Sequence, residues 1–257
     1  MPWKNYLLIL LIVGLFISCA KKNEKITDLN QVDGKRICVL TGSAGDLAAR
    51  AAFPNSTFLD MVGSADAALA VKTGKADVFV YDKGVLLKIV EKNNDMKILN
   101  KPVSKLEVAA AFKKDNQKLV SEINSILDKL KETGELDSLR KKWIESNYSK
   151  APLFRQADYN ATDGVLKMGT SAIYEPYSFI SNGKYTGLDI ELSQIIGRLL
   201  HKKIEIVDMS FEALIPALQA GKIDFALSNF TVTEERKKLI SYSEPYIVND
   251  ISVLVKK

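Results

Sequence analysis

Histidine and cysteine are scarce in this chain of 257 residues, which has one histidine and two cysteines. A Ser-His-Asp site, a Cys-His site or a histidine metal site would depend on His201, which we expect to be exposed where a helix ends. Two cysteines give no disulfide framework, and Cys38 lies in an apolar strand-like run where a free buried thiol is the usual state. The sequence therefore indicates no catalytic residues, no metal site and no cofactor.

Positive charge is also modest and scattered. The formal net charge is +5, and no basic stripe with interleaved aromatic residues occurs along the chain. Nucleic acid is therefore not expected as a partner. What the chain does have is a hydrophobic content of 47%, enough to form the core of one or two domains.

The first 19 residues are typical of a secretory signal. Lys4 precedes an apolar run over residues 7–17, which is short for a membrane span. The run ends in Phe-Ile-Ser-Cys-Ala, which resembles the lipobox of bacterial lipoproteins, with Phe16 where leucine is usual. This resemblance implies lipidation at Cys19, and residues 20–27 would form a polar tether. A plain signal peptide or a core helix remains the alternative.

Hydrophobic periodicity predicts strands that alternate with helices after this segment. We expect strands at residues 36–40, 76–81, 165–169, 203–207 and 223–227. Helices are expected at residues 46–52, 64–72, 117–130, 136–144, 188–200, 211–219 and 234–240. Residues 149–163 lack periodicity and are the best linker candidate. The pattern indicates an α/β architecture with mainly parallel sheets.

One short segment recurs. Residues 70–77 (Ala-Val-Lys-Thr-Gly-Lys-Ala-Asp) match residues 217–224 (Ala-Leu-Gln-Ala-Gly-Lys-Ile-Asp) at an offset of 224 − 77 = 147. Each copy reads as a helix end, a glycine cap and a strand start, which indicates two similar α/β lobes. Polar residues follow both strands, and open α/β sheets bind ligands at that edge.

The second of these strands leads into residues 228–236, Ser-Asn-Phe-Thr-Val-Thr-Glu-Glu-Arg. Thr231 and Glu234 have the spacing of a helix capping box. Free backbone N–H groups at such a helix start favour anions, and Arg236 adds a planar fork suited to a carboxylate. The alternative is a helix cap followed by a solvated arginine.

Polar and aromatic groups at the strand ends match a small zwitterion. Arg236 and nearby hydroxyls suit a carboxylate, Asp82 suits an ammonium group, and Tyr174 and Phe211 could sandwich an apolar stem. Simpler roles are open: Asp82 as a turn residue, the two aromatics as core, and Ser43 as a helix cap. The candidate ligand-binding residues are Thr41, Ser43, Asp82, Ser171, Tyr174, Phe211, Ser228, Asn229, Thr231 and Arg236.

Several motifs resemble the periplasmic solute-binding proteins of polar-amino-acid ABC transporters (type II, family 3). They are Met-Gly-Thr-Ser-Ala-Ile-Tyr-Glu-Pro-Tyr-Ser-Phe at residues 168–179, and the segments 185–192, 214–224, 231–238 and 242–246. Their order differs from the family's, because residues 33–148 carry the usual second half and residues 165–257 the usual first half. The chain therefore resembles a circular permutant with new termini near the hinge between two lobes.

The resemblance implies a two-lobed periplasmic-binding-protein-like fold. Lobe 2 would comprise residues 28–108, and residues 109–148 would be helices that pack on lobe 1. A linker would follow at residues 149–163, and lobe 1 would comprise residues 164–257.

The resemblance also implies a role for each candidate. Arg236, with Thr231 and Ser43, would grip the ligand α-carboxylate, and Asp82 would accept its α-ammonium. Tyr174 and Phe211 would form an aromatic platform, and Ser228 would contribute a carbonyl. Three residues depart from the family pattern: Ser171 stands where some members have aspartate, Asn229 where glycine is common, and Leu40 where some members have a basic residue.

The expected function is that of a monomeric, lipid-anchored binding protein outside the cytoplasm. It would capture an amino acid or similar zwitterion and deliver it to the membrane permease of an ABC transporter. One alternative is an enzyme on the same fold, such as a cyclohexadienyl or arogenate dehydratase, for which Glu175 is the nearest candidate acid. Another is a ligand sensor that signals to a partner protein.

Overall fold

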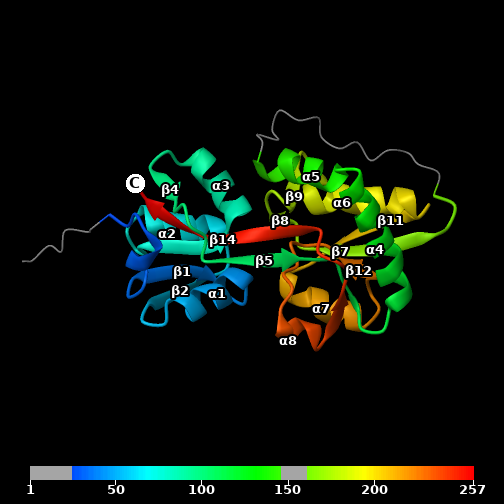
Figure 1. Ribbon diagram of the computed structural model, residues 1–257, viewed down its shortest axis with the longest axis horizontal. Coiled ribbons are helices and arrows are strands. Elements are labelled where there is room, and N and C mark those ends of the chain that lie inside the picture. The colour runs from blue at the N-terminus through cyan, green and yellow to red at the C-terminus, as the bar shows by residue number, and fades with distance from the viewer. Residues whose placement is uncertain (1–24, 146–160) are drawn as a thin grey trace, which may run out of the picture.

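A computed structural model describes residues 25–145 and 161–257. The signal segment, Cys19 and most of the expected linker, residues 149–160, lie outside the described residues. Two lobes lie along the long axis of the molecule, and each consists of a β-sheet flanked by helices (Figure 1). Within the described residues, no helix is long and apolar enough to cross a membrane.

Lobe 2 contains a six-stranded sheet in the order β2-β1-β3-β14-β4, with β5 paired to β14. Its strands are β1 (Arg36–Leu40), β2 (Thr57–Met61), β3 (Val78–Asp82), β4 (Met96–Ile98), β5 (Ser104–Val108) and β14 (Ile247–Lys256). Strands β1, β2 and β3 are parallel, whereas β14 is antiparallel to β3, β4 and β5. The helices are α1 (Ala44–Ala52), α2 (Ser64–Lys72) and α3 (Lys83–Lys92), with a 3₁₀ turn at Leu29–Gln31.

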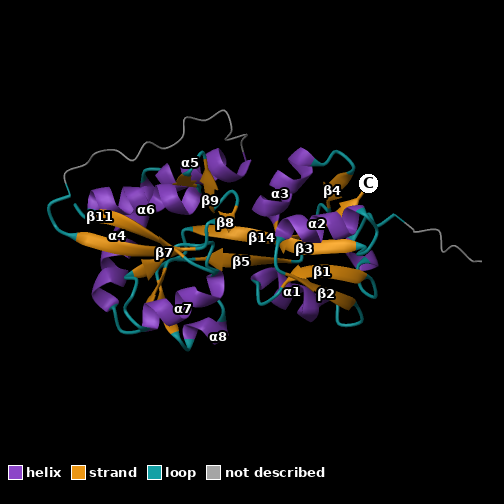
Figure 2. Cartoon of the chain, turned by 180° about the vertical axis from the view of Figure 1, so that it is seen from behind, coloured by secondary structure: helices purple, strands orange, loops and turns teal. Residues whose placement is uncertain are grey.

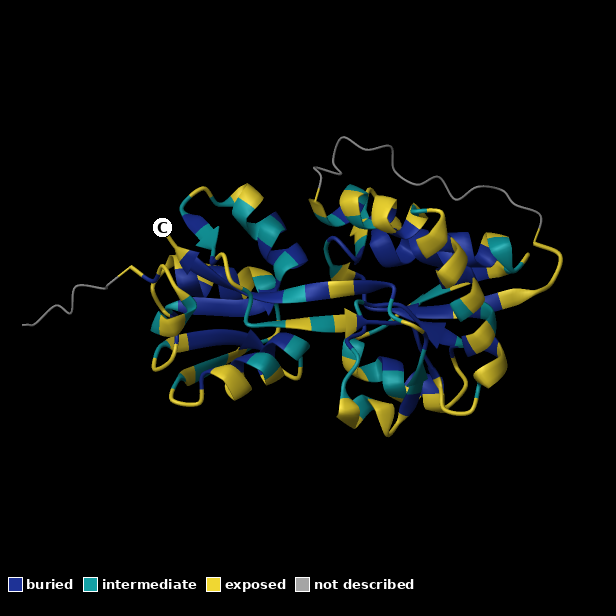
Figure 3. Ribbon diagram, viewed as in Figure 1, coloured by how far each residue is buried: buried dark blue, intermediate teal, exposed yellow. Residues whose placement is uncertain are grey.

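Alternating side chains of the central strands explain why helices cover both faces of this sheet. Cys38 and Phe79 pack in the cluster that includes α2, whereas Val39 and Val80 pack against Ala49 of α1. Strand β3 is buried at all five positions (Figure 3), as expected of a strand covered on both faces. The predicted free, buried state of Cys38 is confirmed, and burial raises the pKa of its thiol to about 11.

Lobe 1 contains a five-stranded sheet in the order β11-β7-β12-β6-β13. Its strands are β6 (Ala111–Lys113), β7 (Val165–Thr170), β11 (Lys203–Asp208), β12 (Phe225–Ala226) and β13 (Ile240–Tyr242). A small antiparallel sheet adds β8 (Ile173–Tyr174), β9 (Ser178–Ser181) and β10 (Lys184–Thr186). The helices are α4 (Gln117–Glu132), α5 (Glu135–Arg140), α6 (Leu188–Leu199), α7 (Phe211–Gln219) and α8 (Glu234–Lys237), with a π-helical turn at Lys141–Glu145.

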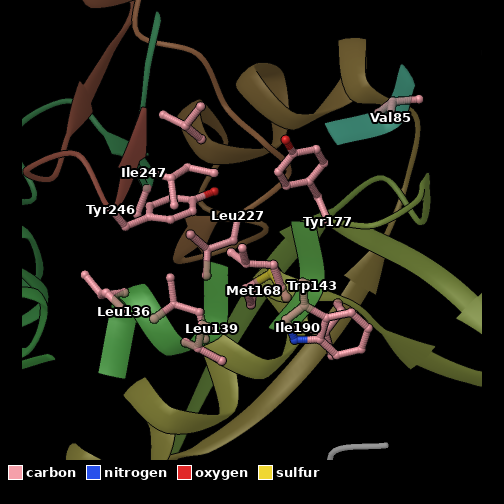
Figure 4. Packing of buried hydrophobic residues seen from close by; sticks show 14 of the residues in the cluster. Val85, Leu136, Leu139, Trp143, Met168, Tyr177, Ile190, Leu227, Tyr246 and Ile247 are labelled. Atoms are coloured by element: carbon pink, nitrogen blue, oxygen red, sulfur yellow. The ribbon is translucent and has the colours of Figure 1, made fainter. Parts of the chain in front are cut away.

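Helices also cover both faces of the lobe 1 sheet. Helices α4, α5 and α6 lie on one side and α7 and α8 on the other (Figure 2). The first group belongs to a large buried cluster, part of which Figure 4 shows. Trp143 is buried there, and its indole N–H donates to Glu191 of α6 at 2.7 Å. The predicted amphipathic helices at residues 117–130 and 136–144 thus pack on lobe 1, although the second changes to a π-helical turn.

Over residues 25–145 and 161–257, the chain passes between the lobes twice, from β5 to β6 and from β13 to β14 (Figure 1). Strands β5 and β14 pair with each other at this crossing, with Ile247 opposite Val108. Both lobes consequently have mixed sheets, because the segments that cross add antiparallel strands to a parallel core. The expectation of mainly parallel sheets was too simple.

Two expected boundaries change as a result. Strand β14 belongs to the sheet of lobe 2, so the segment expected as lobe 1, residues 164–257, gives its last strand to the other lobe. Likewise, β6 gives the segment 109–148 a strand in the lobe 1 sheet. The prediction also placed the new termini near the hinge between the lobes, and the structure does not. A ten-residue strand spans about 33 Å, which carries Lys257 from the crossing to the outer end of lobe 2, where the described chain also begins (Figure 1).

The repeated segment has the same structure in both lobes. In each copy a helix ends, a glycine adopts positive φ (Gly74, 76°; Gly221, 66°), and a strand follows. The aspartate at the end of each copy accepts a backbone N–H from the neighbouring strand, Asp77 from Arg36 at 2.9 Å and Asp224 from Lys167 at 2.7 Å. The offset of 147 residues therefore relates equivalent positions in two similar α/β units.

Candidate functional site

A cavity of about 110 Å³ lies between the lobes and is lined by residues of both. Lobe 2 contributes the carboxyl ends of β1 and β3 and the start of α1, and lobe 1 contributes the segment after β12 and the start of α7. Nine of the ten predicted ligand-binding residues line it: Thr41, Ser43, Asp82, Tyr174, Phe211, Ser228, Asn229, Thr231 and Arg236. Leu40 lines it as well.

The lobe 2 side is a tight turn that leads into α1. Gly42 has φ of 70°, a conformation that glycine adopts without strain, and its N–H donates to Asp46 at 2.9 Å. Ser43 accepts the Asp46 N–H at 3.1 Å and caps α1, so the simpler role predicted for it is confirmed. A Cβ on Gly45 would lie 2.9 Å from the Val80 carbonyl oxygen. The start of α1 therefore packs directly on β3, which places its N-terminus at the cavity.

Arg236 enters the cavity from α8, which is shorter than the predicted helix at residues 234–240 and is capped differently. Thr233, not Thr231, is the N-cap, and its hydroxyl accepts the Arg236 N–H at 3.2 Å. Thr231 is instead part of a bridge to Val108. The Thr231 carbonyl accepts hydrogen bonds from the Arg236 guanidinium at 3.1 Å and from the Tyr242 hydroxyl at 3.2 Å. The capping box was therefore wrong, but the cap holds Arg236 in place.

The guanidinium of Arg236 lies over two neighbouring aromatic rings. Its central carbon lies 5.0 Å from the centroid of Phe211 and 5.1 Å from that of Phe230. Burial lowers its pKa, because an apolar environment disfavours the charged form. Within residues 25–145 and 161–257, no carboxylate forms an ion pair with it. Across the cavity it contacts the Gly42 carbonyl, at 3.4 Å. A partly desolvated cation without a carboxylate partner among the described residues is suited to binding an anion.

The aromatic residues form a wall rather than a sandwich. Tyr174 and Phe211 meet edge to face, with centroids 6.3 Å apart and planes at 87°. Phe211 in turn packs against Phe230 at 4.9 Å. Because Tyr174 and Phe211 contact each other, no apolar stem fits between them, and that prediction was wrong. They can cover only one side of a ligand.

Asp82 lies at the end of β3, where it links the two lobes. Its Oδ1 accepts the hydroxyl of Tyr177, from the β8–β9 turn of lobe 1, at 2.6 Å. Its Oδ2 accepts the side-chain amides of Asn229 at 2.9 Å and Asn249 at 3.1 Å. Burial raises its pKa, and these hydrogen bonds oppose the increase. A buried acceptor therefore lies across the cavity from Arg236, on the other lobe.

A second buried carboxylate supports the segment after β12. Asp189, at the start of α6, accepts the Asn229 backbone N–H at 2.7 Å and the Tyr246 hydroxyl at 2.8 Å. Burial raises the pKa of Asp189 to about 6. Asn229 has φ of 49°, a left-handed conformation that asparagine tolerates better than most residues. The hydrogen bond from the Asn229 N–H to Asp189 fixes this turn and thereby directs the Asn229 side chain toward Asp82.

Two predicted residues lie elsewhere. Ser171 is buried, its N–H donates to Ser228 Oγ at 3.0 Å, and it is not among the residues that line the cavity. Glu175, the acid considered for an enzyme, pairs with Lys92 at 3.2 Å outside the cavity. His201 is exposed beyond the end of α6, as predicted. In the part of the chain that the structure describes, no three His, Cys, Asp or Glu residues are grouped to hold a metal ion.

Several lining residues were not predicted. They are Ala44, Gly45, Met61, Val62, Tyr81, Glu212 and Ile251. Glu212 follows Phe211 in the first turn of α7, where an acidic residue is normally explained by the helix dipole. Met61 ends β2, whose sequence alternates weakly, and Val62 follows it. Ile251 comes from β14, which sequence reasoning had not placed in lobe 2.

Comparison with known families agrees with this geometry. The family model of the bacterial extracellular solute-binding proteins, family 3, matches residues 20–146 and 166–257. The chain belongs to this family. Among the similar curated proteins, the arginine-binding extracellular protein ArtP of Bacillus subtilis (strain 168) is 37% identical over 92 residues, which is 36% of each chain. A probable histidine-binding protein of Campylobacter jejuni is 37% identical over 85 residues, or 33% of each chain.

These curated matches extend over about a third of the length of each relative. The glutamine-binding protein GlnH of Bacillus subtilis matches over more of its length, at 29% identity over 128 residues, 49% of this chain and 47% of that protein. Among solved structures, the arginine-bound domain 1 of TmArgBP is 38% identical, over 37% of this chain and 81% of that chain, with a TM-score of 0.33.

Proposed function

We propose that this protein binds an amino acid or a similar small zwitterion in the cavity between its lobes and delivers it to an ABC transporter. The relatives above are named as an arginine-binding, a probable histidine-binding and a glutamine-binding protein, which supports the ligand class but not one ligand. The family is extracellular, which supports a role outside the cytoplasm. A lipid at Cys19 would hold the protein at the membrane, beside the permease.

One observation carries this proposal. Arg236 is a partly desolvated cation that lies over two aromatic rings, has no ion-pair partner among the described residues, and lines a cavity between the lobes. Such a group binds a carboxylate with charge-assisted hydrogen bonds. Thr231 from lobe 1 and Ser43 from lobe 2 line the same cavity. A ligand held between them would draw the lobes together, which is the hinge closure that links binding to delivery.

We also propose that the chain is a circular permutant of its relatives. The curated matches each cover between a third and a half of the two proteins, as expected if only one half at a time aligns in the same order. A re-permuted chain tests this idea. It would run from residue 161 to 257, then through a flexible linker to residues 25–145, and should fold with unchanged stability. Failure of this chain to fold would contradict the permutation.

The acid considered for the enzyme alternative, Glu175, does not line the cavity. A dehydratase would need an acid over the cavity, and Glu175 is paired with Lys92 outside it. Glu212 does line the cavity, so a direct assay remains useful. Incubation with prephenate or arogenate should give no turnover, and observed turnover would replace the binding role with a catalytic one. A sensory role would show as normal amino-acid uptake in a strain that lacks the protein.

A thermal-shift screen with the twenty common L-amino acids tests the proposed function directly. A ligand present at about 100 times its dissociation constant stabilises the folded state by about 2.7 kcal/mol. We expect at least one amino acid to raise the melting temperature, and the corresponding amine without a carboxylate to have no effect. No shift with any of the twenty would count against the proposal.

A further inference from the structure

Asp82 accepts hydrogen bonds from three side chains of the protein itself. A carboxylate offers about four lone-pair sites on its two oxygens. Tyr177 donates to Oδ1, and Asn229 and Asn249 both donate to Oδ2. An ammonium group from a ligand would therefore have to replace one of the two asparagines before it could bind Oδ2.

Among these donors, Asn229 is the one that lines the cavity together with Asp82. Tyr177 and Asn249 do not line it. Tyr177 is fully buried and Asn249 is 6% exposed, so neither can leave without disturbing the core. Asn229 is half-buried and projects from lobe 1 to a carboxylate on lobe 2. It is the donor that a ligand approaching from the cavity would meet first.

The amide of Asn229 is held in this orientation at both ends. Its Oδ1 accepts Asn249 Nδ2 at 2.7 Å, while its own Nδ2 donates to Asp82 at 2.9 Å. The backbone N–H of Asn229 is bound by Asp189. The repeat gives this contact a simple origin, because Asp82 and Asn229 are 147 residues apart and so occupy equivalent places after the repeated segments. The equivalent strand ends of the two lobes bind each other.

We propose that Asn229 is a specificity-determining residue whose side-chain amide competes with a ligand's ammonium group for Asp82 and latches the two lobes together. The competition rests on the proposed function, in which Asp82 is the ammonium acceptor; the latch does not. The ammonium then contributes little to binding, because its hydrogen bond replaces one that the protein already has. The protein should accept a carboxylate without an amino group almost as well as the corresponding amino acid.

The test uses Asn229→Gly and a matched control. Glycine adopts the φ of 49° at this position without strain and keeps the backbone N–H that Asp189 binds, so the turn should be retained. The control is Asn182→Gly, at an exposed asparagine with φ of 51° outside the cavity. Both substitutions place glycine at a left-handed asparagine, but only the first removes a donor from Asp82.

Calorimetry then compares amino acids with their des-amino analogues. The twenty common L-amino acids are screened first, and the best binder is paired with its analogue, for example L-glutamine with glutaramate or L-arginine with 5-guanidinopentanoate. Wild type and Asn182→Gly should prefer the amino acid by less than about threefold. Asn229→Gly should prefer it by at least about tenfold, equivalent to 1.4 kcal/mol. An unchanged preference in Asn229→Gly would overturn the competition.

Small-angle scattering of the three proteins without added ligand tests the latch separately. Asn229→Gly should have a larger radius of gyration than wild type and Asn182→Gly, because the lobes lose a connection. Equal radii would overturn the latch, whatever the titrations show. If none of the three proteins binds any of the twenty amino acids, the proposed function and the competition both fail, and the scattering result still decides the latch.

Discussion

Replacement of Arg236 by alanine removes the positive charge that we assign to the ligand carboxylate. The guanidinium contacts the carbonyls of Thr231 at 3.1 Å and Gly42 at 3.4 Å but has no carboxylate partner among the described residues. In Arg236→Ala, the bound carboxylate would be left without a counter-charge in a partly desolvated site. Loss of one partner from such a pair costs about 2–5 kcal/mol, so the dissociation constant should rise roughly thirty- to several-thousand-fold.

Isothermal titration calorimetry with the best-binding amino acid measures this change, and two further variants sharpen it. Arg236→Lys keeps the charge but not the planar fork, so it should bind more weakly than wild type and more tightly than Arg236→Ala. Arg198→Ala, at an exposed position on α6, should bind like wild type. Wild-type affinity in a folded Arg236→Ala protein would refute the reasoning, and circular dichroism shows whether the variant is folded.

Three other changes test the surrounding structure. Gly84→Ala places a Cβ 2.5 Å from the Tyr177 hydroxyl and should lower the free energy of unfolding by about 1–3 kcal/mol in urea. Thr233→Ala removes the N-cap of α8 and should destabilise that helix by about 1 kcal/mol. Because the helix carries Arg236, calorimetry should show weaker ligand binding. Asp189 has a pKa of about 6, above its ordinary 3.8. The free energy of unfolding of wild type should therefore fall by up to about 3 kcal/mol as pH rises from 4 to 7. That of Asp189→Asn should fall by less over the same pH range.

Each of these three has a result that would contradict it. Wild-type unfolding in Gly84→Ala would mean that Tyr177 moves aside freely. Unchanged ligand affinity in Thr233→Ala would mean that the cap does not position Arg236. For Asp189, the folded state keeps a proton that the unfolded state releases above pH 4, so the stability it contributes is lost as pH rises through 6. If the free energy of unfolding depended on pH equally in wild type and Asp189→Asn, a group other than Asp189 would cause the dependence.

Local patterns predicted the elements that bear most of the site. The helices at residues 64–72 and 211–219 have the predicted bounds, because each has a glycine just past its end. The strand at residues 36–40 is likewise as predicted. The position of Thr41, Asp82 and Arg236 at or after strand ends was sufficient to predict that they share one cavity. Parallel α/β units place the carboxyl ends of their strands at one edge of the sheet.

Contacts between lobes could not be predicted in the same way. The partners of Asp82 come from residues 177, 229 and 249, which no local periodicity connects. Strand β14 was assigned to lobe 1 because it follows lobe 1 in sequence, yet its pairing with β3 puts it in lobe 2. The cap of α8 moved from Thr231 to Thr233 because Thr231 is held by an antiparallel bridge to Val108. In each case a long-range hydrogen bond decided between local options.

A crystal structure with the amino acid that gives the largest thermal shift tests the central claim most directly. The account predicts electron density for that amino acid between the lobes, with its carboxylate on the Arg236 guanidinium and within hydrogen-bond distance of Thr231 and Ser43. Density at another surface, or a ligand in the cavity whose carboxylate points away from Arg236, would contradict it.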